Sequence, residues 1–147
     1  MKFFKSLNTL LFMLWIVTES SGQELQFLSL GTDTLRIKDQ EIIIKFRIKP
    51  GYHIQSNEPG SDLMIPSRLD LEFSDGSKPR QIYFSEPHEF LLEGVAHEVF
   101  SDSLTVRIPV ETEYSGMEQV KLEFFYQACD ERKCYFPRKL SSSLWLK

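Results

Sequence analysis

The sequence predicts an all-β protein, an antiparallel β-sandwich, and three observations support that fold class. Apolar and polar residues alternate with period two in several segments, a pattern typical of strands with one buried and one solvated face. Turn-forming residues separate these segments, and no segment carries a convincing apolar stripe with the period of a helix. Aromatic residues, which favour strands, make up 13% of the 147 residues.

Residues 1–22 have the pattern of a secretory signal peptide. A start with two lysines precedes a mostly apolar run at residues 7–17, and Ser20 and Gly22 supply the small side chains of a cleavage site. The alternative is an uncleaved membrane anchor, but the apolar run is shorter than the about 20 residues that span a bilayer. We therefore expect an exported chain whose mature part, residues 23–147, has no stable membrane insertion.

Five later segments predict the strands of the sandwich in chain order. Every second residue of each segment is apolar and the residues between are mostly polar, so each strand is expected to bury one face. The residues expected in the core are Ile42, Ile44, Phe46 and Ile48, then Leu69, Leu71 and Phe73, then Leu104, Val106, Ile108 and Val110, then Val120, Leu122, Phe124 and Tyr126, and finally Leu140, Leu144 and Leu146. Turns are predicted at residues 49–51, 58–60, 74–77 and 115–116. Short strands at this spacing are typical of one domain with an immunoglobulin-like, two-sheet sandwich.

Charge and histidine spacing exclude several classes of function. The net charge is −4 and the sequence has no basic cluster, which argues against nucleic acid and anionic membranes as partners. The three histidines, His53, His88 and His97, lack ligand spacings such as His-x-x-x-His. We therefore expect surface or turn histidines, with no metal site and no cofactor.

The only two cysteines, Cys129 and Cys134, have four residues between them. In an oxidising compartment two thiols this close pair readily. Counting by twos from Val120 puts Ala128 on the core face and Cys129 on the other face, unless a bulge flips the parity. The cysteines flank a four-residue turn, so they can oppose each other across a hairpin with Cα atoms about 4.5–5.5 Å apart. The sequence thus predicts a disulfide near the surface at one end of the sandwich.

Such a disulfide either stabilises the fold as a structural cross-link or takes part in thiol–disulfide exchange. The chain-entropy model gives so short a ring only about 2 kcal/mol, which argues against a structural clip. Within the loop, Arg132 and Lys133 favour a thiolate, whereas Asp130 and Glu131 oppose it. A thiol of such modest reactivity suits docking to a partner that supplies the reactivity. The alternative is a static hairpin disulfide in a non-catalytic secreted binding or structural domain, and spacing alone leaves both open.

Four stretches of the sequence together point to a known family. They are Gly51-Tyr52-His53-Ile54, Ile65-Pro66, Pro87-His88-Glu89-Phe90-Leu91-Leu92-Glu93-Gly94, and Tyr126-Gln127-Ala128-Cys129 with the continuation to Pro137. With these motifs the chain resembles the N-terminal periplasmic domain of the bacterial thiol:disulfide interchange protein DsbD, from about Gly51 to the C-terminus. It departs in two places. Four rather than five residues separate the cysteines, and Phe136 stands where many members have a second proline.

The resemblance implies an immunoglobulin-like fold with one redox-active cysteine pair. Such a pair accepts electrons from a thioredoxin-like domain and passes them to periplasmic oxidoreductases. By motif position, Cys134 would form the mixed disulfide with a partner and Cys129 would resolve it. A cap loop at residues 89–92 would cover the pair until a partner arrives, with Phe90 as the aromatic cap between Glu89 and Leu91.

The resemblance also implies an activity class and partners. The chain would be a protein-disulfide reductase type electron-transfer module in the bacterial periplasm, in the context of cytochrome c biogenesis. Its partners would be thioredoxin-like periplasmic proteins or domains, with a separate membrane electron carrier as a further candidate. We expect neither a thioredoxin-like nor a transmembrane domain here, so the chain would be one link in a relay. The aromatic residues Phe125, Tyr135 and Phe136 beside the cysteines form a candidate docking surface.

Overall fold

The computed structural model describes residues 26–32, 34–110 and 118–147. Every regular element in these residues is a strand and none is a helix, so the predicted all-β, immunoglobulin-like sandwich is confirmed. The strands are β1 (Leu28–Leu30), β2 (Thr34–Leu35), β3 (Ile37–Lys38), β4 (Glu41–Ile48), β5 (His53–Gln55), β6 (Arg68–Glu72), β7 (Tyr83–Phe84), β8 (His88–Leu92), β9 (Val95–Ser101), β10 (Ser103–Pro109), β11 (Glu118–Tyr126), β12 (Ala128–Cys129) and β13 (Arg138–Leu146).

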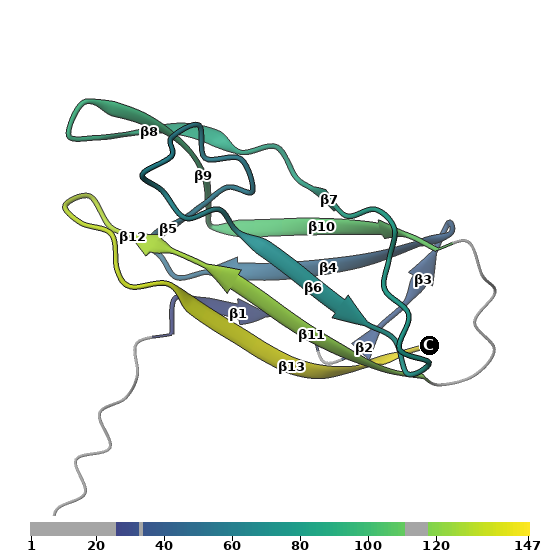
Figure 1. The fold of residues 1–147 in the computed structure, drawn as a ribbon. Helices are drawn as coiled ribbons and strands as arrows, with labels where there is room; N and C mark the ends of the chain where they lie inside the picture. The colour runs from purple at the N-terminus through teal and green to yellow at the C-terminus, as the bar shows by residue number, and fades with distance from the viewer. Residues whose placement is uncertain (1–25, 33, 111–117) are drawn as a thin grey trace, which may run out of the picture.

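The strands of the described residues form three sheets (Figure 1). The first has the order β1-β4-β10-β7, with β3 beside β4, and the second has the order β2-β13-β11-β6. A third, smaller sheet has the order β12-β5-β9-β8. Neighbouring strands are antiparallel, as predicted, with one exception: β2 pairs with β13 in parallel.

The core lies between the first two sheets, where the predicted strands bury their apolar faces. The ring of Phe46 on β4 meets that of Phe124 on β11, with 4.7 Å between their centroids. All the predicted core residues are buried except Leu140, which is half-buried. The alternation therefore identifies the core faces correctly, because a strand between a packed sheet and water must alternate apolar and polar side chains.

The third sheet lies at the end of the sandwich away from the C-terminus (Figure 1). It forms because the chain leaves the second sheet after Tyr126 and starts a new pairing at Ala128, opposite Ile54 on β5. Gln127, between the two pairings, belongs to no strand. This break interrupts the alternation, so the face that counting from Val120 predicts for Cys129 does not apply.

Two sequence-based expectations lie outside the described residues. These are the signal peptide at residues 1–22 and the turn at residues 115–116. Within the described residues, no helix has the length and hydrophobicity that crossing a membrane requires.

Candidate redox site

Cys129 and Cys134 form a disulfide with an S–S distance of 2.04 Å. They are antiparallel bridge partners across the turn between them, as the spacing predicts. Their Cα atoms are 3.9 Å apart, closer than the expected separation.

The hairpin that carries the disulfide is held by hydrogen bonds of its own. The carboxylate of Asp130 accepts from the backbone N–H groups of Arg132 and Lys133 at 2.7 and 2.9 Å. Two backbone bonds close the turn: Asp130 N–H donates to the Lys133 carbonyl at 2.9 Å, and Tyr135 N–H donates to the Ala128 carbonyl at 2.8 Å. An Asp side chain that accepts hydrogen bonds from backbone N–H groups of the next few residues is common in turns. The shape of the hairpin therefore does not depend on the disulfide alone.

A second contact ties Asp130 to the far side of the hairpin. The Tyr135 hydroxyl donates to Asp130 Oδ2 at 2.7 Å. This bond, helped by the two backbone donors, lowers the pKa of Asp130 to about 2. The same bond raises the pKa of Tyr135 to about 12. At neutral pH the loop thus holds a fixed negative charge beside the cysteines.

The two cysteines differ in burial, and the sequence-based placement of Cys129 was wrong. Cys129 is 0% exposed, whereas Cys134 is half-buried. The reason is the break at Gln127, which lets both Ala128 and Cys129 be buried in β12. Only the Cys134 side of the disulfide is near the surface.

Gln55 contacts the buried sulfur directly. Its side-chain Nε2 donates to Cys129 Sγ at 3.3 Å, and the residue is 0% exposed. Its Oε1 is buried and has no hydrogen-bond partner. The sequence motifs do not identify Gln55 as part of the site. Alternation along β5 puts His53 and Gln55 on one face, but no local signal says that β5 pairs with the cysteine strand.

The segment predicted as a cap loop is strand β8 and not a loop. Its role as a cap over the disulfide stays a prediction. β8 pairs with β9 in a hairpin, and Phe90 lies opposite His97. The connection is Glu93-Gly94, with φ of 50° and 80°. Two left-handed residues in succession are what a two-residue hairpin turn of type I′ requires. The sequence does not predict this hairpin, because a Glu-Gly pair is a weaker turn signal than Asn-Gly or Asp-Gly.

Phe90 packs on His53, which is the strand partner of Cys129. The two ring centroids are 4.0 Å apart, and Phe90 is half-buried. His53 is the strand partner of Cys129, and side chains of directly opposed residues lie on the same face of a sheet. Of the other two predicted cap residues, Glu89 is exposed and Leu91 is 62% exposed.

The three histidines belong to strands of the third sheet, at this end of the molecule. His88 is exposed, as expected for a surface residue, whereas the burial of the other two corrects the expectation. His53 and His97 are buried, and His88 Nε2 lies 3.2 Å from Ser101 Oγ. Burial is the main cause that lowers the pKa of His53 to about 4, with His88 and His97 adding to the effect and Asp130 opposing it. His53 is therefore neutral at neutral pH. Among the described residues, no group of three or more His, Cys, Asp or Glu side chains is placed to hold a metal ion.

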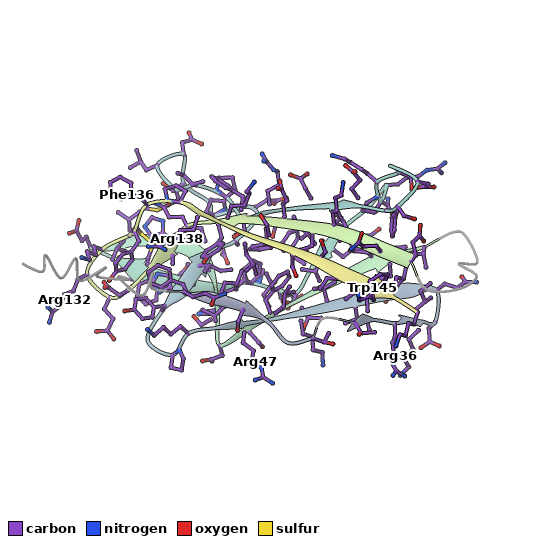
Figure 2. The ribbon with its side chains drawn as sticks, turned by 90° about the horizontal axis from the view of Figure 1, so that it is seen from below. Arg36, Arg47, Arg132, Phe136, Arg138 and Trp145 are labelled. Atoms are coloured by element: carbon purple, nitrogen blue, oxygen red, sulfur yellow. A yellow bond between two sulfur atoms is a disulfide. The ribbon has the colours of Figure 1, made fainter. Side chains whose placement is uncertain are left out.

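The three predicted docking residues have different environments. Phe136 is 91% exposed, and Figure 2 shows it at the same end of the molecule as Arg132 of the hairpin. Tyr135 is half-buried against Phe27, with ring centroids 4.8 Å apart. Phe125 lies on β11 with the guanidinium of Arg68 over its ring at 5.9 Å. Phe136 is thus the aromatic side chain of the three that is most open to a partner.

Comparisons with known proteins point to one family. The family model described as the thiol:disulfide interchange protein DsbD, N-terminal, matches residues 26–144. No curated protein sequence matches the chain significantly.

Three solved structures share the fold at low sequence identity. The N-terminal domain of Neisseria meningitidis DsbD in its reduced form is 21% identical, with a TM-score of 0.50 over 75% of this chain and 80% of that one. The complex of the DsbD and PilB N-terminal domains from the same organism is 19% identical, with a TM-score of 0.53 over 79% of this chain and 80% of that one. The N-terminal periplasmic domain of ScsB from Proteus mirabilis is 12% identical, with a TM-score of 0.52 over 76% of this chain and 43% of that one.

Proposed function

The chain belongs to the family of N-terminal domains of the thiol:disulfide interchange protein DsbD, and from this premise we propose that it is a thiol–disulfide exchange module that relays reducing equivalents through Cys129 and Cys134. The activity is of the protein-disulfide reductase type. The disulfide accepts two electrons from a reduced donor and passes them to oxidised partner proteins.

The observation that carries this proposal is the asymmetry of the disulfide. Cys129 is fully buried, whereas Cys134 is half-buried and precedes the exposed Phe136. We therefore expect an incoming thiolate to attack the Cys134 sulfur and not the Cys129 sulfur, and exchange rates depend on which sulfur is attacked. A structural clip needs no such asymmetry, and the hydrogen bonds around Asp130 already shape the hairpin.

The asymmetry supports a different role for each cysteine. A donor thiolate attacks Cys134, the bond between the two sulfurs breaks, and Cys129 leaves as a thiolate. A second donor thiol then releases Cys134, so that the donor is oxidised to a disulfide and the domain gains two thiols. In the opposite half of the cycle Cys134 attacks an oxidised partner, and Cys129 resolves the mixed disulfide.

The partners we propose are thioredoxin-like proteins or domains, with a separate membrane electron carrier as a further donor. A related structure holds a DsbD N-terminal domain in complex with a PilB N-terminal domain, which supports recognition of a protein partner by this fold. Exposed apolar side chains are available for docking: Phe136 and Leu63 are 91% and 86% exposed. The proposed compartment is the periplasm, in agreement with the signal-peptide pattern of residues 1–22.

A redox titration tests the proposal against a static disulfide. The oxidised protein is equilibrated in a graded series of thiol–disulfide buffers, and free thiols are counted at each potential. An exchange pair equilibrates in a mild range, whereas a structural disulfide resists reduction down to below about −300 mV. A midpoint in that lower range would favour the alternative, a secreted domain with a static hairpin disulfide.

The cysteine roles are tested by trapping. Cys129→Ser removes the resolving thiol, so the remaining Cys134 should hold an oxidised thioredoxin-like partner as a stable mixed disulfide. Non-reducing gels measure the trapped complex, and Cys134→Ser is the matched control. If Cys134→Ser traps the partner and Cys129→Ser does not, the two roles are reversed.

A further inference from the structure

We propose that Gln55 is a catalytic residue of the exchange reaction, the hydrogen-bond donor that stabilises the Cys129 sulfur as it leaves the disulfide. This inference rests on the proposed function and adds a residue from outside the cysteine hairpin. Its starting point is the contact in which Gln55 Nε2 donates to Cys129 Sγ at 3.3 Å.

Burial gives this contact its importance. Cys129 and Gln55 are both 0% exposed, so water cannot solvate a negative charge that develops on the sulfur. Apolar surroundings disfavour a thiolate, and a poor leaving thiolate slows exchange. A donor that already points at the sulfur offsets this cost, in the way that fixed donors stabilise an oxyanion in acyl transfer.

The other end of the same side chain argues against a purely stabilising role for the amide. Gln55 Oε1 is buried without a hydrogen-bond partner. A buried acceptor without a partner destabilises a fold, and such groups in native proteins call for an explanation. A methionine has the same length without the unpaired oxygen. Donation to the sulfur accounts for the amide, whereas packing does not.

Reduction of the disulfide takes two successive thiolate attacks. A thiolate of the donor attacks Cys134 Sγ and forms a new S–S bond with it. The electron pair of the old S–S bond moves to Cys129 Sγ, which becomes a thiolate while it accepts the N–H of Gln55. The second thiol of the donor, after losing its proton, attacks the first donor sulfur and releases Cys134. The two new thiolates take up protons from water.

The direct test compares reduction rates of the oxidised full chain. Gln55→Met keeps the length of the side chain and removes the donor. Loss of a hydrogen bond to a developing charge should slow reduction by excess dithiothreitol about tenfold. Denaturant melts should show equal or greater stability, because the unpaired oxygen is removed as well. Reduction at the wild-type rate would overturn the inference.

Gln127 provides a matched control. It is a second glutamine beside the cysteines, and it bonds backbone rather than sulfur. Its Oε1 accepts from Ile65 N–H and its Nε2 donates to the Tyr135 carbonyl, both at 3.2 Å. Gln127→Met should therefore lower stability with no change in reduction rate beyond experimental error. Equal slowing in both variants would assign the effect to local packing and overturn the inference.

A second variant keeps the test decisive if Gln55→Met does not fold. Gln55→Glu can donate to the sulfur while its carboxyl is protonated, but the ionised form has no donor and adds a negative charge. The ratio of its reduction rate to that of the wild type should fall as pH rises through the pKa of that carboxyl. A ratio independent of pH would contradict the role of Gln55. A wild-type disulfide that mild thiols do not reduce would instead overturn the proposed function, and this inference with it.

Discussion

The body of the sandwich and its redox end are built from different kinds of buried residue. Between the first two sheets the interior consists of apolar side chains such as Phe46 and Phe124. The buried polar residues in the described part of the chain all belong to the third sheet or hydrogen-bond to it. They are His53, Gln55, Ser56, Ser67 and His97.

This difference separates stability from reactivity. Apolar burial stabilises the body in proportion to the area removed from water. At the redox end, two buried polar atoms, Gln55 Oε1 and His97 Nδ1, have no hydrogen-bond partner. Unpaired buried groups cost stability, so a domain can hold them only where the rest of the fold offsets that cost. Substitutions in the body of the sandwich should therefore change mainly the free energy of unfolding. Substitutions at the redox end should change mainly the rate at which the disulfide is reduced.

The largest effect is expected for a truncation in the body. Phe124→Ala removes a fully buried ring that contacts Phe46, and core Phe→Ala changes cost about 3–5 kcal/mol. Denaturant melts of the oxidised protein measure this loss. Under conditions where the variant remains folded, its disulfide should be reduced at the wild-type rate. A changed rate would mean that body and end are coupled rather than separate.

A smaller effect is expected when the disulfide itself is reduced. Its ring is short, so the loss of stability should be at most about 2 kcal/mol. The hydrogen bonds of Asp130 and Tyr135 remain to hold the hairpin. Melts of the oxidised and reduced protein give the difference. Unfolding on reduction at room temperature would instead identify the disulfide as a structural clip.

The same division explains what the sequence could and could not predict. In the body, alternation is a local signal, and residues such as Ile44 and Leu122 are buried as it predicts. The structure of the redox end depends on the non-local pairing of β5 with β12 and on the break in the strand at Gln127. Motifs located the cysteines, but no local pattern identifies Gln55 as the donor to Cys129.

The pH dependence of stability should also arise at the redox end. His53 is neutral in the fold, with a pKa lowered to about 4, mainly by burial. Unfolding exposes the imidazole, which then binds a proton at its ordinary pKa near 6.5. The unfolded state therefore binds more protons between these values, and stability falls as pH drops from about 6.5 to 4. His53→Phe should flatten this part of the curve of unfolding free energy against pH. An unchanged slope would assign the titration to another group.

The smallest change in stability, with a clear change in reactivity, is expected at Phe90. Its ring packs on His53, which is the strand partner of Cys129. If the ring shields the disulfide, Phe90→Ala should speed reduction by dithiothreitol, the opposite of the change expected for Gln55→Met. Leu91→Ala is the matched control, because Leu91 follows on the same strand but is 62% exposed and should leave the rate unchanged.

Stability decides between the two roles that Phe90 can have. A half-buried ring at the end of the sandwich should cost well below the about 3–5 kcal/mol of a core Phe when it is truncated. A faster reduction with little loss of stability means that the ring covers the disulfide until a partner displaces it. A full core-sized loss, or a rate equal to that of the wild type, would mean that Phe90 only packs against His53. Protection of the disulfide would then have to come from the burial of Cys129 alone.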